Sequence, residues 1–279
     1  MNTIAQALQQ AARRLAVHDS ARLDAEVLLM HVLDKPRSHL HAWPEKTLTA
    51  TEQAQFDNLL EQRAAGVPVA QLTGTREFWS LRLEVTADTL IPRPDTEILV
   101  EQALSQLPAE QPLRVADLGT GSGAIALALA HERPDWQLIA LDRSPACIDV
   151  ARRNAQRLGL TGPLFLVGNW CSAFAAASLD VIVSNPPYVA NRDPHLQQGD
   201  VRFEPLSALA AGADGLDAIR RLAGDAARVL KPAGRLFLEH APGQTGDIHE
   251  ILKTNGFTDR YTAHDLAGRE RVTGAQRGA

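Results

Sequence analysis

Residues Asn185, Pro186, Pro187 and Tyr188 form a tetrapeptide that could hold a planar amide or amine group. They follow the apolar run DVIVS, which predicts a strand. Two consecutive prolines have a fixed φ and no N–H, so the turn should be stiff and its carbonyl groups held in place. The side-chain oxygen of Asn185 and the carbonyl oxygen of Pro186 can then accept both hydrogens of an NH₂ group, while Tyr188 stacks on the planar group.

This arrangement predicts chemistry at a weak nucleophile. An amide nitrogen reacts poorly because its lone pair is delocalised into the carbonyl. Two acceptors directed at its hydrogens would bias the nitrogen toward a pyramidal, nucleophilic geometry. If the electrophile is a sulfonium methyl group, as the ligand predicted below for a glycine-rich loop would supply, the attack needs orientation more than acid–base help. We therefore predict methyl transfer without a metal ion, with Asn185, Pro186 and Tyr188 as the catalytic residues.

A glycine-rich loop follows the apolar run LRVADL, with Asp117 at the end of the predicted strand. Gly119, Gly121 and Gly123 would let the chain turn tightly and let a ligand approach the backbone, and the following helix would present free N–H groups. Asp142 ends the next predicted strand, where a carboxylate can accept both hydroxyls of a ribose.

Three ligands and a ligand-free turn compete for this loop. No Gly-Lys-Ser/Thr follows, which excludes a nucleotide P-loop. The third glycine comes one residue too early for a dinucleotide fingerprint, and Asp117 would repel a pyrophosphate. The same carboxylate suits the ammonium group of S-adenosylmethionine, which is the ligand we predict.

Other candidate residues have both functional and structural interpretations. Trp170, after the third predicted strand, could stack on an adenine ring or pack in the core. His240, after the fifth, could touch substrate, although a structural role is favoured. The nine histidines show no metal-ligand spacing, and Cys147 and Cys171 are expected to be buried thiols.

The elements that position these residues alternate between strands and helices from Leu113 onward. Fully apolar strands in such an alternation predict a parallel sheet covered on both faces. The segments FTDRYTAHD and ERVTGAQ predict a final antiparallel hairpin. We expect an α/β fold with a Rossmann-like, mostly parallel seven-stranded sheet over residues 89–279.

Two shorter regions precede this domain. Residues 1–73 show helical spacing of apolar residues, for example Ile4, Leu8 and Leu15, and predict a small helical domain. Residues 74–88 alternate and include aromatic residues, which predicts a hairpin linker.

Composition limits the location and partners of the 279-residue chain. Its net charge of −5 and pI near 6.0 disfavour stable nucleic-acid binding. We find no signal peptide and no apolar run long enough for a membrane span, so we expect a cytoplasmic protein without membrane contact.

Nearly the whole chain resembles bacterial peptide chain release factor glutamine methyltransferases, the PrmC/HemK family. The resemblance is carried by LIPRPDTE at 90–97, DLGTGSGAIALALA at 117–130, the acid of LDRS at Asp142, NW at 169–170, SNPPYV at 184–189 and DPHLQQGDVRFEPLSAL at 193–209. DNA methyltransferases do not generally share the last segment.

The resemblance implies specific roles. The cofactor S-adenosylmethionine would contact the loop Gly119, Thr120, Gly121, Ser122 and Gly123, together with Asp142, Trp170 and Asn185. Asn185 to Tyr188, including Pro187, would also hold the substrate. That substrate would be the glutamine of a Gly-Gly-Gln tripeptide in class I release factors. Because a tripeptide alone gives little contact area, we expect the helical domain to dock the release factor.

Two alternatives remain at this stage. A DNA methyltransferase acting on the exocyclic amine of a flipped adenine or cytosine uses similar chemistry, but the acidic net charge disfavours it. A non-catalytic S-adenosylmethionine-binding module is disfavoured by the presence of Asn185 and Tyr188.

Overall fold

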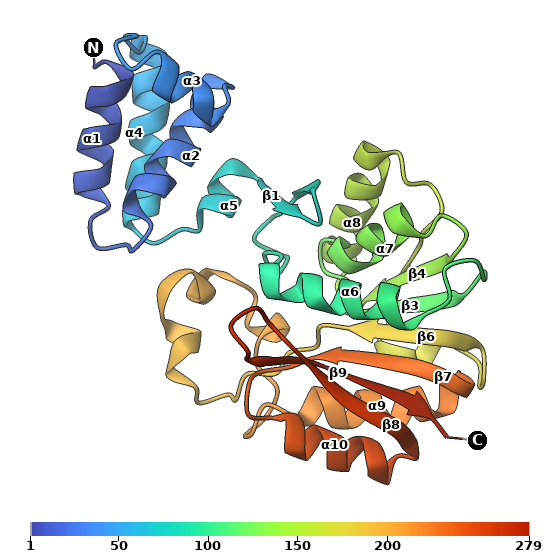
Figure 1. Cartoon of the computed structure of the whole chain (residues 1–279). Helices are drawn as coiled ribbons and strands as arrows, with labels where there is room; N and C mark the ends of the chain where they lie inside the picture. The colour runs from blue at the N-terminus through green and yellow to red at the C-terminus, as the bar shows by residue number, and fades with distance from the viewer. Residues whose placement is uncertain (1, 279) are drawn as a thin grey trace. The chain divides into compact units, whose positions relative to one another are not determined.

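A computed structural model of the chain describes residues 2–278, which divide into two compact units, one ending at Thr75 and one beginning at Arg76 (Figure 1). The first unit is helical, with α1 (Ile4–Arg14), α2 (Ala21–Leu33), α3 (Arg37–Ala42), α4 (Ala50–Ala64) and α5 (Val69–Thr73).

Apolar residues at helical spacing form the core of the first unit, including Leu8 of α1, Leu28 of α2 and Phe56 of α4. An ion pair between Asp24 and Arg63 is buried beside this core, with 2.7 Å between Oδ2 and Nε. Burying one of these charges without the other would be costly, so the pair fixes how α2 and α4 meet.

A hairpin of β1 (Thr75–Phe78) and β2 (Leu81–Glu84) starts at the last residue of the first unit and otherwise belongs to the second. Trp79 and Ser80 connect the strands with φ of +52° and +59°, the left-handed values that a two-residue hairpin turn requires. The Oδ1 atom of the buried Asn154 side chain accepts a hydrogen bond from the backbone N–H of Glu84 at 2.6 Å. This bond fixes the hairpin to the helix that contains Asn154.

A seven-stranded sheet forms the centre of the second unit, in the order β5-β4-β3-β6-β7-β9-β8. The first five strands in this order are parallel and β9 is antiparallel to both of its neighbours, which confirms the predicted mostly parallel sheet. Its strands are β3 (Arg114–Leu118), β4 (Gln137–Asp142), β5 (Leu164–Val167), β6 (Leu179–Ser184), β7 (Leu230–Glu239), β8 (Phe257–His264) and β9 (Glu270–Arg277).

Helices cover both faces of this sheet because successive strand residues point to opposite sides. On one face Val115 packs with residues of α6, α7 and α8, and on the other Ala116 packs with residues of α9 and α10. The helices are α6 (Glu97–Gln106), α7 (Ala124–Glu132), α8 (Pro145–Leu158), α9 (Asp217–Val229) and α10 (Thr245–Thr254).

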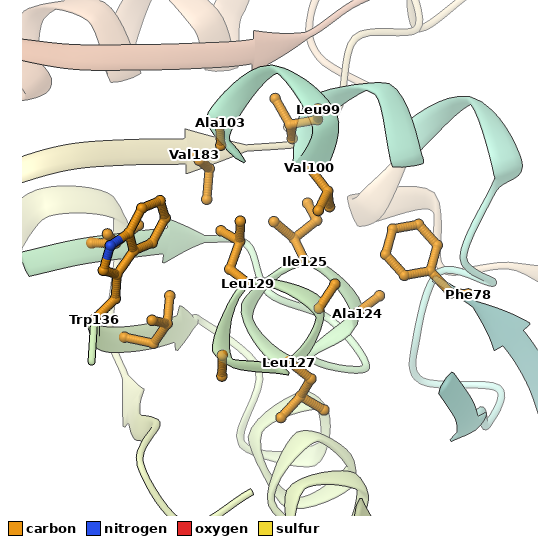
Figure 2. Packing of buried hydrophobic residues seen from close by; sticks show 14 of the residues in the cluster. Phe78, Leu99, Val100, Ala103, Ala124, Ile125, Leu127, Leu129, Trp136 and Val183 are labelled. Atoms are coloured by element: carbon orange, nitrogen blue, oxygen red, sulfur yellow. The ribbon is translucent and has the colours of Figure 1, made fainter. Parts of the chain in front are cut away.

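Helix α7 is apolar on all sides, and every residue from Ala124 to Ala130 is buried. Figure 2 shows Ile125, Leu127 and Leu129 of α7 among apolar side chains that include Leu99 of α6 and Trp136. A helix buried in this way is held rigidly, so the loop that leads into it has a fixed exit point.

Helix α8 has a capping residue at each end. The Ser144 side chain accepts the backbone N–H of Cys147 at the first turn, and Gly159 ends the helix in the left-handed conformation. None of the helices among residues 2–278 is both long and apolar enough to cross a lipid bilayer.

Candidate active site

A cavity of about 490 Å³ lies at the carboxyl ends of β3, β4, β5 and β6. The strand order reverses between β3 and β6, and ligands of open α/β sheets bind outside the strand ends at such a reversal. The sequence-predicted residues that line the cavity are Gly119, Gly121, Asp142, Trp170, Asn185 and Pro187.

The glycine loop (Gly119–Gly123) follows β3 and takes its shape from left-handed backbone angles. The φ values of Gly119, Gly121 and Gly123 are +78°, +56° and +85°, which residues with a side chain rarely adopt. A Cβ atom on Gly123 would also lie 3.1 Å from Ala151 Cβ and from Leu127 Cδ1. The third glycine therefore allows α7 and α8 to approach, while the first two expose backbone to the cavity.

Asp142, the last residue of β4, presents a half-buried carboxylate to the cavity. Its Oδ2 accepts the backbone N–H of Gly121 at 3.0 Å, and its Oδ1 accepts that of Ser144 at 2.9 Å. Each carboxylate oxygen has a second lone pair, so a ribose hydroxyl can still be accepted. The carboxylate is thus oriented by the same loop that lines the cavity.

Trp170 lines the cavity beside Gly168 and Asn169. Its φ is +49°, a left-handed value that is costly for a bulky residue and that typically occurs where the surrounding structure enforces it, often at binding sites. A Cβ atom on Gly119 would approach the Trp170 ring to 4.0 Å. The indole and the bare glycine backbone therefore form neighbouring parts of the cavity wall.

The NPPY turn (Asn185–Tyr188) leaves β6 next to the glycine loop. Asn185 and Pro187 line the cavity, whereas Pro186 is buried. The Asn185 Nδ2 donates to Thr96 Oγ1 at 3.2 Å, which directs the amide nitrogen away and leaves Oδ1 as the free end of the side chain.

Tyr188 also belongs to the turn, but it does not line the cavity. Its hydroxyl donates to Glu239 Oε1 at 3.1 Å. Burial raises the pKa of Tyr188, and the nearby Glu239 carboxylate raises this pKa further. The Gln244 side chain donates to the Tyr188 carbonyl oxygen at 3.0 Å and fixes the end of the turn. Stacking of Tyr188 on a substrate group stays a prediction.

Asp117 lies beneath the glycine loop and is fully buried rather than exposed in the cavity wall. Its Oδ2 accepts the Thr120 hydroxyl at 2.6 Å and the Ala126 N–H at 3.2 Å. Burial raises the pKa of Asp117 to about 7. The carboxyl joins the loop to the first turn of α7, and its predicted contact with a cofactor ammonium stays a prediction.

The remaining predicted residues also lie outside the cavity lining. Thr120 and Ser122 are buried within the loop, where the Ser122 carbonyl oxygen accepts Asn154 Nδ2 at 2.9 Å. His240 is buried, with its Nε2 2.9 Å from Thr273 Oγ1 and its Nδ1 2.9 Å from the Ala241 carbonyl oxygen. This environment is that of a structural histidine.

Two segments of the cavity wall contain residues to which no chemical role was assigned from the sequence. Leu90 comes from the first and Phe203 and Glu204 from the second. The Glu204 side chain accepts the Ile91 N–H at 2.9 Å and also pairs with the Arg93 guanidinium, so it fastens the two segments together. Both lie in stretches that carried the family resemblance, which was the only sequence signal for them.

Both units match known protein families. A family model described as the PrmC N-terminal domain matches residues 6–74, and one described as the Methyltransferase small domain matches residues 95–200. Among solved structures, a methyltransferase from Pyrococcus furiosus has a TM-score of 0.54 at 16% identity, covering 80% of this chain and 100% of that one. At this identity the likeness shows the fold alone.

Curated relatives match at much higher identity. The chain is 52% identical to the release factor glutamine methyltransferase of Xylella fastidiosa, over 90% of this chain and 92% of that protein. It is 49% identical to that of Escherichia coli, over 95% and 96%. The protein of the same name from Coxiella burnetii is 43% identical over the full length of both chains.

Proposed function

We infer that this chain, which belongs to the family of release factor glutamine methyltransferases, transfers a methyl group from S-adenosylmethionine to a glutamine side-chain amide nitrogen of a release factor. In the finer proposal the target is the glutamine of the Gly-Gly-Gln tripeptide in class I release factors. Asn185 and the glycine loop line one cavity, and this shared location is the observation that carries methyl transfer at Asn185.

The residues around the cavity fit S-adenosylmethionine. Asp142 offers an oriented carboxylate for the ribose hydroxyls, and Trp170 offers a flat wall for the adenine. Gly119 and Gly121 leave the backbone bare, so the methionine portion can lie against it. The cofactor supplies, when bound, an electrophilic methyl group on a sulfonium.

Residues of the NPPY turn then prepare the nucleophile. The free Oδ1 of Asn185 and the carbonyl oxygen of Pro186 accept the two amide hydrogens and bias the nitrogen toward a pyramidal geometry. As the new C–N bond forms, the methyl–sulfur bond of the sulfonium would break and its electron pair would stay on the sulfur of a neutral thioether. The methylated nitrogen then gives up one of its two hydrogens as a proton to water, because the amide oxygens that hold these hydrogens are too weakly basic to keep it. Buried Pro186 keeps its carbonyl fixed, so little reorganisation accompanies the transfer.

A labelled-methyl assay tests this function directly. The purified protein is incubated with labelled S-adenosylmethionine and either a class I release factor, DNA or no acceptor, and the modified residue is mapped by mass spectrometry. We expect label only on the glutamine of Gly-Gly-Gln, and none on a release factor with that glutamine changed to alanine. Label in DNA, or at another residue, would overturn the proposal.

We further propose that the helical unit docks the release factor. A tripeptide gives little contact area, whereas specific protein recognition usually buries about 800 Å² per partner. The helical unit has its own core and contributes no residue that we assign to the cofactor. A substrate of the translation machinery also favours a cytoplasmic location.

Removal of residues 1–73 separates the two functions. The truncated protein should still bind S-adenosylmethionine but lose most of its activity on intact release factor. A thermal melt must show that the remaining unit is folded. Full activity of a folded truncated protein would show that the helical unit is not the docking surface.

A further inference from the structure

Glu239 is the last residue of β7 and lies at the same sheet edge as the NPPY turn, because β7 pairs with β6 up to Leu238 and Ser184. The residue is 1% exposed. A buried carboxylate loses its hydration and is retained only where neighbouring groups compensate or where it has a task. Glu239 does not line the cavity, so such a task must act through other residues.

Two hydroxyl groups act on the Glu239 carboxyl. The Tyr188 hydroxyl donates to Oε1 at 3.1 Å. Burial raises the pKa of Glu239 to about 7, and the hydroxyls of Thr96 and Tyr188 oppose that rise as hydrogen-bond donors. The Oε2 atom is buried and has no hydrogen-bond partner among the described residues, so it is open to the Thr96 hydroxyl, which lies close enough to lower the pKa of this carboxyl.

Thr96 connects this carboxyl to the catalytic turn. It is 4% exposed, and its Oγ1 accepts Asn185 Nδ2 at 3.2 Å. A threonine hydroxyl has one proton, and the bond with Asn185 does not use it. That proton is therefore available for the carboxylate of Glu239, which only accepts when it is ionised.

The direction of each hydrogen bond in this series decides which end of the Asn185 amide faces the cavity. Amide oxygen and nitrogen are similar in size, so their neighbours set the orientation. If Thr96 donated to Asn185 instead, the Asn185 NH₂ group would face the cavity. Two NH₂ groups would then oppose each other, and the substrate nitrogen would lose an acceptor.

We propose that Glu239 is a positioning residue: by accepting the Thr96 hydroxyl proton it makes Thr96 an acceptor for Asn185 Nδ2, and so presents the Asn185 oxygen to the substrate amide. This inference rests on the proposed function. Through Tyr188 the same carboxyl also holds the far end of the turn.

Glu239→Gln and Thr96→Val test the proposal. Glutamine has the shape of glutamate but can donate as well as accept, and valine has the shape of threonine without a hydroxyl. We expect kcat to fall about 10- to 100-fold in each, the range typical for partners that orient a functional group. The S-adenosylmethionine Kd and the release factor KM should change little, and Thr96→Ser, which keeps the hydroxyl, should retain near-wild-type kcat.

Thr273→Val is the matched control, because Thr273 is a buried threonine whose hydroxyl is bonded to His240 and lies outside this series. It should lower Tm by a similar amount and leave kcat unchanged. Wild-type kcat in Glu239→Gln, or equal losses in Thr96→Val and Thr96→Ser, would overturn the positioning role. Absence of methylation by the wild-type enzyme would instead contradict the proposed function.

Discussion

The glycine loop and the NPPY turn each lie beside one buried carboxyl group, and burial raises the pKa of both carboxyls to about 7. The two are built differently. Asp117 bonds to groups three and nine residues away, whereas the residue bonded to Glu239 is 51 residues away. The loop is thus organised locally and the turn by tertiary structure. We expect changes in the loop to alter cofactor binding and changes around the turn to alter turnover.

Asn185→Ala should have the largest effect, and it tests whether changes in the NPPY turn act on turnover. Removing one positioned polar group that acts in the transition state should lower kcat about 10²- to 10³-fold, with a much smaller rise in the release factor KM. Steady-state kinetics measures both. Asn191→Ala is the control, because Asn191 is an exposed asparagine whose side chain accepts the Gly212 N–H and does not line the cavity. Turnover near wild type would remove Asn185 from the mechanism.

Asp142→Ala should instead act on cofactor binding, because Asp142 is bonded to the glycine loop. Loss of a charge-assisted acceptor weakens binding by about 1.5–3 kcal/mol, or about 10- to 150-fold in the S-adenosylmethionine Kd. Calorimetry provides the measurement. Asp180→Ala is matched to it, since Asp180 also accepts a backbone N–H, that of Arg114 at 2.9 Å, but lies outside the cavity. An unchanged affinity in Asp142→Ala would disprove the ribose contact.

The pH dependence of kcat should come from the turn rather than from the loop. Glu239 is an acid whose pKa is raised to about 7, so lowering the pH below 7 protonates it, and the carboxyl gains an O–H donor that competes with acceptance of the Thr96 hydroxyl proton. The charged groups that act on it are Arg271, which lowers this pKa, and Asp95, which raises it. At one pH unit below the pKa, kcat should fall about tenfold.

Two variants show whether Glu239 or Asp117 causes this fall of kcat at low pH, which is the acid limb of the kcat–pH profile. A kcat–pH profile of Glu239→Gln should be lower throughout but flat on the acid side. Asp117→Asn should keep the limb, since Asp117 supports the loop and does not contact the turn. A limb that disappears only in Asp117→Asn would reverse the assignment.

Gly121→Ala should have the smallest effect and measures the cost of the loop's shape. A Cβ atom on Gly121 meets nothing within 4 Å, so its φ of +56° is the only obstacle. Left-handed backbone costs an ordinary residue about 1–2 kcal/mol. Gly246→Ala also enters open space but without a positive φ, and it should not destabilise. Equal melting temperatures of the two variants would show that loop strain is negligible.

Features whose residues are adjacent in the sequence were the more predictable. The glycine spacing, the acid at the end of β4 and the Asn-Pro-Pro-Tyr run each carry their chemistry in adjacent residues, and Gly119, Gly121, Asp142 and Asn185 do line one cavity. The alternation of apolar strands with helices likewise gave the sheet and its antiparallel end.

The partners of the turn could not be predicted in the same way. Thr96 and Glu239 come from elements that no spacing rule connects to Asn185, and only the folded sheet brings them to one edge. Asp117 was expected to face a ligand because it lies at the end of a predicted strand, just before the glycine loop. Its burial under the loop depends on the Thr120 and Ala126 bonds, which sequence does not reveal.

The position of β9 between β7 and β8 bears on how the chain is made. Until Arg277 has left the ribosome, β7 keeps an open edge from Arg235 to Glu239 and β8 has no partner strand. At about 5–20 residues synthesised per second, the emerging chain passes some seconds with an unpaired edge, which is when strands pair wrongly with other molecules. Closure of this part of the sheet therefore waits until β9 has been made, and we expect chaperone dependence to depend on the β8–β9 hairpin more than on the helical unit.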